Sequence, residues 1–282
     1  MNCFDCPRCC TVKSFCGKDG EHIRIAKVMN HIYEEPLICP EGQGCGAVFF
    51  SFCSLKCTYC QNYDISHLGK GKDYTKSEVA DIIREVASSG VASLDLVTPT
   101  HYCHDLIDVL QEVKPAIPVV WNTSGYERVE NIDELASVVD IFLFDFKYYD
   151  KDLSLTLSKA PDYFDVCMSA LKRARELIPH DEIENGIMKK GIIVRHLILP
   201  GHTDDSVNVF RSIKDSIGTD IYISLMSQFS PFYKAKDCGL DRCISPLEYK
   251  KVLYAIQKMG FNKGFTQDLS SADKCYTPNF DE

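Results

Sequence analysis

Residues 52–63 read FCSLKCTYCQNY and place Cys53, Cys57 and Cys60 at a Cys-x3-Cys-x2-Cys spacing. The apolar run before them predicts a buried strand, so the three thiols are expected in the loop at its carboxyl end, where α/β folds place their chemistry. Cysteine thiolates are the usual protein ligands of iron–sulfur clusters, and three of them leave one iron of a four-iron cluster open. Zinc is the alternative metal. A closed zinc site takes four ligands, and His67 is near enough in the sequence to be the fourth.

Strand-like and helix-like segments alternate about six times from residue 46 onward. The strand candidates are apolar on consecutive positions, as expected of parallel strands buried on both faces; they are residues 47–52, 94–98, 119–122, 141–146, 192–199 and 221–226. The helix candidates are the stretch after a capping box at residues 75–78, and residues 106–113, 129–139, 163–178 and 247–259. This pattern predicts an α/β fold with a parallel sheet, and favours an open or closed barrel over a doubly wound sheet.

The chain has 282 residues, a formal net charge of −9 and 15 cysteines. The length suits one large domain with a small appendage, and an acidic chain without a long basic run is not expected to bind nucleic acid. No apolar run approaches the roughly 20 residues that span a bilayer, and the first residues do not read as a secretory signal. We therefore expect a cytoplasmic protein without a membrane partner, in which many cysteines indicate metal binding or catalysis rather than disulfides.

The cysteine triplet, with the aromatic Tyr59 before its last member, resembles the defining motif of the radical S-adenosylmethionine (SAM) superfamily. Longer blocks resemble the uncharacterised homologues of pyruvate formate-lyase activating enzyme; they are residues 34–36, 60–66, 97–102, 122–126, 145–148, 160–164 and 194–201. The resemblance implies a partial (β/α)6 barrel that holds a 4Fe-4S cluster and binds SAM. It also implies reductive cleavage of SAM to a 5'-deoxyadenosyl radical, with a reductant such as flavodoxin or ferredoxin as a partner.

The resemblance assigns cofactor contacts to residues at the strand ends. Thr98 and Thr100 stand where related enzymes carry Gly-Gly-Glu, so their hydroxyls are expected to replace the glutamate, or else to cap a helix. Asn122 and Ser124 lie in a segment similar to the Asp-Thr-Asn-Gly of glycyl-radical activases and are expected to contact the cofactor. Gln228 ends the sixth strand and is expected near the adenosine.

Three charged residues are expected inside the barrel. Asp145 and Lys147 alternate along the fourth strand, so both point to the same face, where they form either an inert ion pair or a functional one. They resemble the Asp-x-Lys motif of activases, which implies that Lys147 contacts SAM or substrate and that Asp145 contacts a monovalent cation or Lys147. Arg195 interrupts an apolar run, and we expect it to bind the methionine carboxylate of SAM or an acidic substrate.

Residues 1–45 are predicted to form a cysteine-rich extension, and residues 46–282 the main domain. The pattern of Cys3, Cys6, Cys10 and Cys16 matches that of the same family and implies a second metal site, holding zinc, iron or another Fe-S cluster. Metal binding would hold together a segment too polar to form a core, although free thiols are the alternative. Cys9 could replace Cys10, and Cys39 with Cys45 could complete a different ligand set. Activases with extra clusters carry them after the first triplet, so the position differs here.

Three functions remain open on the sequence. The first is activation of a partner glycyl-radical enzyme, which the matches at residues 122–125 and 145–147 favour. The second is radical modification of a small molecule or of another protein, which the missing Gly-Gly-Glu and the displaced cysteines favour. The third is a non-catalytic metal-binding protein, which would leave SAM intact.

Overall fold

The computed structural model describes residues 3–11, 13–267 and 280. In this part of the chain ten strands form one sheet: β1 (Ile23–His31), β2 (Cys45–Phe50), β3 (Lys72–Tyr74), β4 (Leu94–Val97), β5 (Val119–Thr123), β6 (Ile141–Asp145), β7 (Glu182–Glu184), β8 (Ile187–Leu197), β9 (Tyr222–Met226) and β10 (Gly264–Thr266). The helices are α1 (Tyr63–Ser66), α2 (Lys76–Ser88), α3 (Cys103–Val113), α4 (Val129–Leu135), α5 (Lys151–Ser158), α6 (Tyr163–Leu177), α7 (Thr203–Ile217) and α8 (Pro246–Met259).

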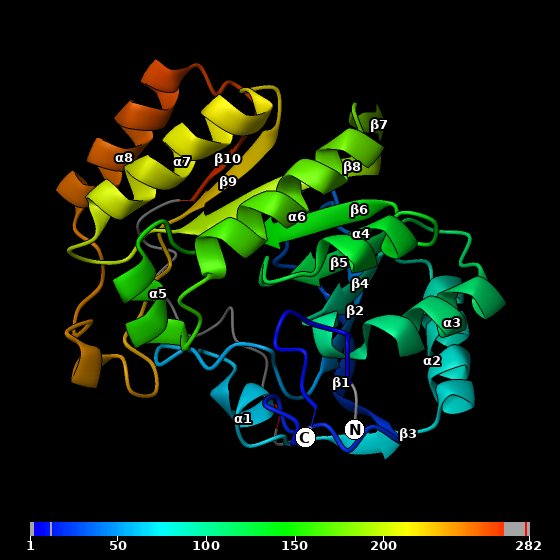
Figure 1. The fold of residues 1–282 in the computed structure, drawn as a ribbon. Helices are drawn as coiled ribbons and strands as arrows, with labels where there is room; N and C mark the ends of the chain where they lie inside the picture. The colour runs from blue at the N-terminus through cyan, green and yellow to red at the C-terminus, as the bar shows by residue number, and fades with distance from the viewer. Residues whose placement is uncertain (1–2, 12, 268–279, 281–282) are drawn as a thin grey trace.

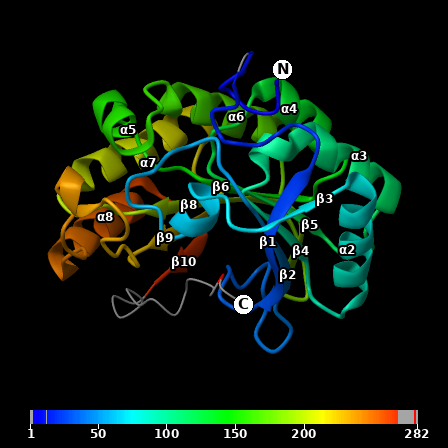
Figure 2. The ribbon, with the colours of Figure 1, turned by 90° about the horizontal axis from the view of Figure 1, so that it is seen from below.

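The six predicted strands form the parallel centre of the sheet. β2, β4, β5, β6, β8 and β9 are hydrogen-bonded to one another in that order, each parallel to the next. The order ends at β10 on one side and at β3 on the other, so the sheet is open rather than closed. Figures 1 and 2 show the larger helices along the outer side of the curved sheet. The predicted partial barrel is confirmed.

Local sequence signals explain where the helices begin. The Thr75 hydroxyl accepts a hydrogen bond from the Glu78 amide, and the Glu78 carboxylate accepts one from the Thr75 amide, so the predicted capping box starts α2. Ser245 and Glu248 form a second capping box at the start of α8, with Pro246 in its first turn. None of the helices in the described ranges combines the length and the apolar composition that crossing a bilayer requires.

The connection between β1 and β2 closes the amino end of the barrel. β1 pairs antiparallel with β2, so residues 23–31 belong to the main sheet even though the sequence places them in the extension. Residues 32–44 then cross the amino ends of the parallel strands, and Ile38 is fully buried there among the inward side chains of β5, β6 and β8. The carbonyl of Ile38 accepts a hydrogen bond from the Ser93 hydroxyl at 2.7 Å. This loop therefore forms the floor of the barrel.

Candidate functional site

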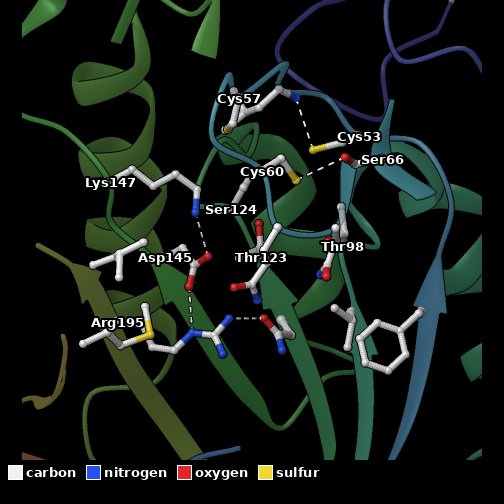
Figure 3. A pocket seen from close by; sticks show the side chains of 18 of the residues that line it. Cys53, Cys57, Cys60, Ser66, Thr98, Thr123, Ser124, Asp145, Lys147 and Arg195 are labelled. Carbon is white, nitrogen blue, oxygen red and sulfur yellow. Dashed lines mark hydrogen bonds and ion pairs between the residues drawn. The ribbon is translucent and has the colours of Figure 1, made fainter. Parts of the chain in front are cut away.

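The barrel encloses a cavity of about 220 Å³ between the cysteine loop and the floor. All three thiols of the predicted triplet line it, and so do Tyr59, Thr98, Asn122, Ser124, Asp145, Lys147, Arg195 and Gln228. Figure 3 shows the cysteines at one end of the cavity and Arg195 toward the other, with Asp145 between them. The fold thus brings the predicted residues of the cluster and cofactor site, except Thr100, to one place, although they come from six different segments.

The cysteine loop starts at a strained turn directly after β2. Phe52 has a φ of 73°, a left-handed conformation that is rare for a residue with a bulky side chain. Its ring lies where side chains on Gly17 and Gly69 would be, because a Cβ on either glycine would come within 3.0 Å of the ring. The turn is therefore possible because two glycines leave space for the ring, and it directs the chain from the strand into the cavity wall.

Each cysteine sulfur of the triplet has a hydrogen-bond partner supplied by the chain. The Leu55 amide donates to Cys53 Sγ at 3.4 Å, and the Ser158 hydroxyl donates to Cys57 Sγ at 3.0 Å. The Ser66 hydroxyl lies 3.2 Å from Cys60 Sγ. Donors of this kind stabilise the negative charge of a thiolate.

Burial raises the pKa of the three thiols. The pKa of Cys53 is raised to about 12 and that of Cys60 to about 11, in both cases by burial first and then by the neighbouring Cys57 thiol; burial also raises the pKa of Cys57. Such thiols ionise when a cationic centre binds them, so the set suits metal ligation rather than free nucleophiles. Three thiols with donors on one cavity wall fit a four-iron cluster with one open iron.

Tyr59 links the cysteine loop to the far wall. Its hydroxyl lies 2.6 Å from the Tyr148 hydroxyl, which in turn lies 2.6 Å from the hydroxyl of Ser158. Because Ser158 donates to Cys57, a continuous chain of hydroxyls runs from Tyr59 to that thiol. Tyr59 also packs on Phe229, with ring centroids 5.9 Å apart. It therefore fixes the shape of the loop.

Asp145 joins the two cations of the cavity. One carboxylate oxygen lies 2.7 Å from Lys147 Nζ and the other lies 2.7 Å from Arg195 Nε. Burial alone would raise the pKa of Asp145, but Arg195 and Lys147 lower it to about 2. The alternation argument that placed Asp145 and Lys147 on one face is confirmed by their shared position in the cavity wall.

Arg195 is held by three partners. Besides Asp145, its guanidinium donates to Glu34 Oε2 at 2.7 Å and to Asn122 Oδ1 at 2.5 Å. Glu35 Oε2 lies 3.8 Å away, beyond hydrogen-bond distance. Each of the three nitrogens of Arg195 thus donates to a partner within the chain, which makes it a rigid part of the wall.

Two groups of acidic residues were not singled out by sequence reasoning as site residues. Glu34 and Glu35 enter the sequence argument only as part of a block that resembles a known family, and Asp95 does not enter it. Asp95 is fully buried in β4, where it accepts a hydrogen bond from Asn122 at 3.2 Å. Burial raises the pKa of Asp95 to about 7 even though Arg195 lowers it, and burial holds the pKa of Glu34 well above its usual value. A charged residue inside an apolar strand is the same signal that identified Arg195.

Thr98 and Thr100 have different surroundings. Thr98 lines the cavity and has a φ of 60°. Thr100 lies outside the cavity, where its buried hydroxyl donates to Glu127 Oε1 at 2.6 Å. Glu127 also accepts hydrogen bonds from Trp121 and Thr123, so Thr100 helps to tie the ends of β4 and β5 together. Gln228 accepts a hydrogen bond from Gln267 at 3.1 Å at the cavity edge.

The amino-terminal thiols form a second group, distinct from the cavity. Burial raises the pKa of Cys6, and the nearby thiols of Cys16, Cys3 and Cys10 raise it further. The Phe15 amide donates to Cys10 Sγ at 3.3 Å. Across residues 3–11, 13–267 and 280, no three His, Cys, Asp or Glu side chains converge closely enough to hold a single metal ion, and this applies to both cysteine groups. A four-iron cluster is larger than one ion, so its ligands lie farther apart.

The amino-terminal segment rests directly on the cysteine loop. Arg8 Nε donates to the carbonyl of Ser54 at 2.9 Å, and Lys56 Nζ donates to the carbonyl of Cys16 at 3.2 Å. The cysteines in the described ranges are free thiols. The two cysteine groups therefore lie against each other, although only one of them faces the cavity.

Comparison with known proteins gives a consistent result. The model of the radical SAM superfamily matches residues 47–213. The uncharacterized protein MJ0674 of Methanocaldococcus jannaschii is 30% identical over 273 residues, which cover 91% of this chain and 75% of that protein. The pyruvate formate-lyase-activating enzyme of Clostridium pasteurianum is 29% identical over 173 residues, covering 57% of this chain and 65% of the relative.

A solved structure shows the same fold. The crystal structure of SuiB of Streptococcus suis bound to S-adenosylmethionine has a TM-score of 0.53 and 15% identity, and it covers 77% of this chain. The match spans about half of the SuiB chain, at 48% of its length. At this level of identity the likeness concerns the fold alone.

Proposed function

We propose that this chain, which belongs to the radical SAM superfamily, reductively cleaves S-adenosylmethionine at the cavity below its cysteine loop. Membership of the family implies a 4Fe-4S cluster, bound SAM and a reductant. When bound, these cofactors supply one-electron cleavage of SAM to a 5'-deoxyadenosyl radical, which takes a hydrogen atom from the substrate. The observation that carries the proposal is that Cys53, Cys57 and Cys60 all open on one cavity, each with a hydrogen-bond partner at its sulfur.

The chain's own residues would hold and orient the cofactors. The three thiols would hold the cluster, and Ser66 and Ser158 would stabilise their negative charge. Lys147 is the better candidate for the methionine carboxylate of SAM, because it lies toward the cysteine end of the cavity with Asp145 as its ion-pair partner, whereas Arg195 lies toward the floor and is held there by Glu34 and Asn122. Thr98, Ser124 and Gln228 would contact the rest of SAM from the strand ends. Phe229 and Met226 line the same cavity and would exclude water.

Electron paramagnetic resonance of the reduced, cluster-loaded protein tests this assignment. We expect a 4Fe-4S signal that changes shape when SAM is added, because SAM would bind the open iron. A variant with Cys53, Cys57 and Cys60 changed to alanine should lose the signal, whereas Cys243→Ala, which removes an exposed thiol outside the cavity, should keep it. A signal that ignores SAM, or that survives in the triple variant, would disprove the assignment.

Two candidate functions differ in the molecule from which the 5'-deoxyadenosyl radical takes a hydrogen atom. The residues that match glycyl-radical activases, Asn122, Ser124, Asp145 and Lys147, gather in one cavity, which supports activation of a partner glycyl-radical enzyme. With flavodoxin or ferredoxin as the reductant, the partner should then show a protein-based doublet in electron paramagnetic resonance. If no encoded partner gives a doublet, and deuterium passes from a labelled small molecule or another protein into 5'-deoxyadenosine, the second candidate function holds instead.

We propose that Cys3, Cys6, Cys10 and Cys16 hold a second metal, which is zinc, iron or another Fe-S cluster. The nearby thiols that raise the pKa of Cys6, and the amide donor at Cys10, support this role. Many free thiols also fit a reducing compartment such as the cytoplasm. Metal analysis of a variant with Cys6 and Cys10 changed to serine should show loss of this metal with the four irons of the first cluster retained. An unchanged metal content would refute the second site.

A further inference from the structure

The floor of the cavity carries an excess of acidic groups. Glu34 and Glu35 reach it from the loop at residues 32–44, and Asp95 adjoins them through its hydrogen bond with Asn122. Together with Asp145 these make four carboxylates. Among the described residues that line the cavity, the permanent cations are Lys147 and Arg195, and Lys147 sits with Asp145 toward the cysteine end. Arg195 alone therefore serves three carboxylates at the floor.

Two carboxylate oxygens at the floor have no hydrogen-bond partner. Glu35 Oε2 and Asp95 Oδ1 are both buried without a hydrogen-bond partner, with Arg195 Nη1 3.8 Å from Glu35 Oε2, and the two residues are only 7% and 0% exposed. Leaving a buried carboxylate oxygen unpaired is costly, so native structures rarely keep such a group without a partner. Arg195 does not supply one in this structure, because its Nη1 donates to Glu34 and lies 3.8 Å from Glu35 Oε2, beyond hydrogen-bond distance. Glu35 lines the cavity, so a group bound in the cavity could supply the missing donor.

The negative charge and the free acceptor oxygens of the floor indicate which kind of group would bind there. In the part of the chain that the structure describes, no three acidic, His or Cys side chains lie close enough together to hold a single metal ion, and the floor of the cavity is lined by no thiols that would suit a cluster. An ammonium group carries three N–H donors that point to separate acceptors, and its charge offsets the acidic excess. Figure 3 shows Lys147 nearer the cysteines than Arg195 is, so the carboxylate of SAM would be attracted to the cysteine end and repelled by the carboxylates of the floor. The floor thus suits a cation other than the cofactor.

We propose that the floor of the cavity, where Glu34 and Glu35 line the space and the fully buried Asp95 adds its charge through Asn122, binds the aliphatic ammonium group of the substrate. The inference rests on the proposed function, because it assigns the substrate end of the same cavity. It defines a substrate class: a free primary amine or a lysine side chain of a peptide, held by its ammonium so that a C–H bond faces the cofactor end.

Equilibrium dialysis with radiolabelled n-butylammonium tests the floor directly in the cluster-loaded, SAM-bound protein. We expect one saturable site, from which unlabelled n-butanol and butyrate at equal concentration fail to displace the label. Glu35→Gln should weaken binding at least 10-fold, because it removes the carboxylate charge that faces the cavity while keeping the shape of the side chain. The matched control is Glu41→Gln in the same loop, where the side chain is exposed, and it should leave binding unchanged. Asp95→Asn is a second variant that should also weaken binding. It provides the test if Glu35→Gln does not fold.

The source of the ammonium is decided by a peptide competitor. Displacement of the label by the capped tripeptide acetyl-Gly-Lys-Gly-amide would assign a lysine side chain, and displacement by unlabelled butylammonium alone would assign a free amine. Equal competition by butanol, or unchanged binding in both floor variants, would overturn the proposal. So would a loss of SAM affinity in Glu35→Gln, because the floor would then serve the cofactor. SAM binding and cleavage are measured first on the wild-type protein, so failure of the proposed function is seen separately from failure of the ammonium site.

Discussion

The two ends of the cavity differ in how their buried carboxylates are paired with cations. At the cysteine end, Asp145 is paired with both Lys147 and Arg195, and these cations lower its pKa to about 2. At the floor, Asp95 leaves one oxygen unpaired, and burial raises its pKa to about 7. Asp95 lies in β4 and Asp145 in β6, both on the inward face of the sheet. The difference between their pKa values therefore comes from the number of cations near each carboxylate. The contrast indicates an end that is complete and an end that awaits a cationic ligand.

The largest effect is expected from removing the carboxylate that joins the two ends. Asp145→Ala leaves Lys147 and part of Arg195 unpaired in a buried wall, which should lower the free energy of unfolding by about 3–5 kcal/mol. Urea denaturation measures this loss. The control is Asp152→Ala, which removes an exposed carboxylate in the first turn of α5. If both variants lose the same stability, the pairing at the cysteine end contributes little.

A smaller effect is expected from the cation at the cysteine end. Lys147→Met should weaken SAM binding about 10-fold to 100-fold, because a hydrogen bond to a charged group contributes about 1.5–3 kcal/mol. Butylammonium binding at the floor should not change. Titration calorimetry measures both affinities, with the exposed Lys151→Met as the matched control. Full SAM affinity in Lys147→Met would remove Lys147 from the cofactor contacts.

We expect the Asp95 carboxyl group at the floor to make the free energy of unfolding depend on pH. The raised pKa of Asp95 means that its contribution to stability is complete below about pH 4, its unfolded value, and is lost as the pH rises through about 7. Arg195, Asn122, Glu34, Glu35 and Cys39 are the groups that face it. Asp95→Asn should therefore gain stability relative to the wild type between pH 4 and 7, by at most about 1.4 kcal/mol per pH unit. A difference independent of pH would contradict this assignment.

The smallest effect concerns the contact between the two cysteine groups. Arg8→Ala removes the hydrogen bond to the Ser54 carbonyl and the packing of the guanidinium 4.0 Å from the Phe15 ring centre. A loss of about 1 kcal/mol is expected, confined to the cysteine loop. Hydrogen exchange of residues 53–60 should accelerate in this variant and stay unchanged in Lys13→Ala, which alters an exposed side chain of the same segment. Equal exchange in both variants would mean that the segment does not brace the loop.

The sequence predicted the parts of the fold that depend on local pattern. Consecutive apolar residues marked the six parallel strands, and alternation placed Asp145 and Lys147 on one face. Helices α5 and α7 were missed, although α7 buries Val209, Phe210 and Ile213 at helical spacing.

The parts that could not be predicted depend on contacts between distant residues. The glycine-rich turn at residues 41–46 read as a domain boundary, yet β1 and β2 pair on either side of it and the loop returns to form the floor. Thr100 could equally have faced the cofactor, and only the fold shows that Glu127 accepts its hydrogen bond. Asp95 was within reach of sequence reasoning, because a lone carboxylate in the strand LDLV carries the same signal as Arg195.

The cleavage of SAM itself tests the central claim most directly. The cluster-loaded protein is reduced under anaerobic conditions and incubated with SAM, and 5'-deoxyadenosine is measured by chromatography. We predict that the wild type and Cys243→Ala form 5'-deoxyadenosine and methionine in equal amounts, and that the variant with Cys53, Cys57 and Cys60 changed to alanine forms neither. Intact SAM in the presence of a full cluster, or equal cleavage by the triple variant, would contradict the account.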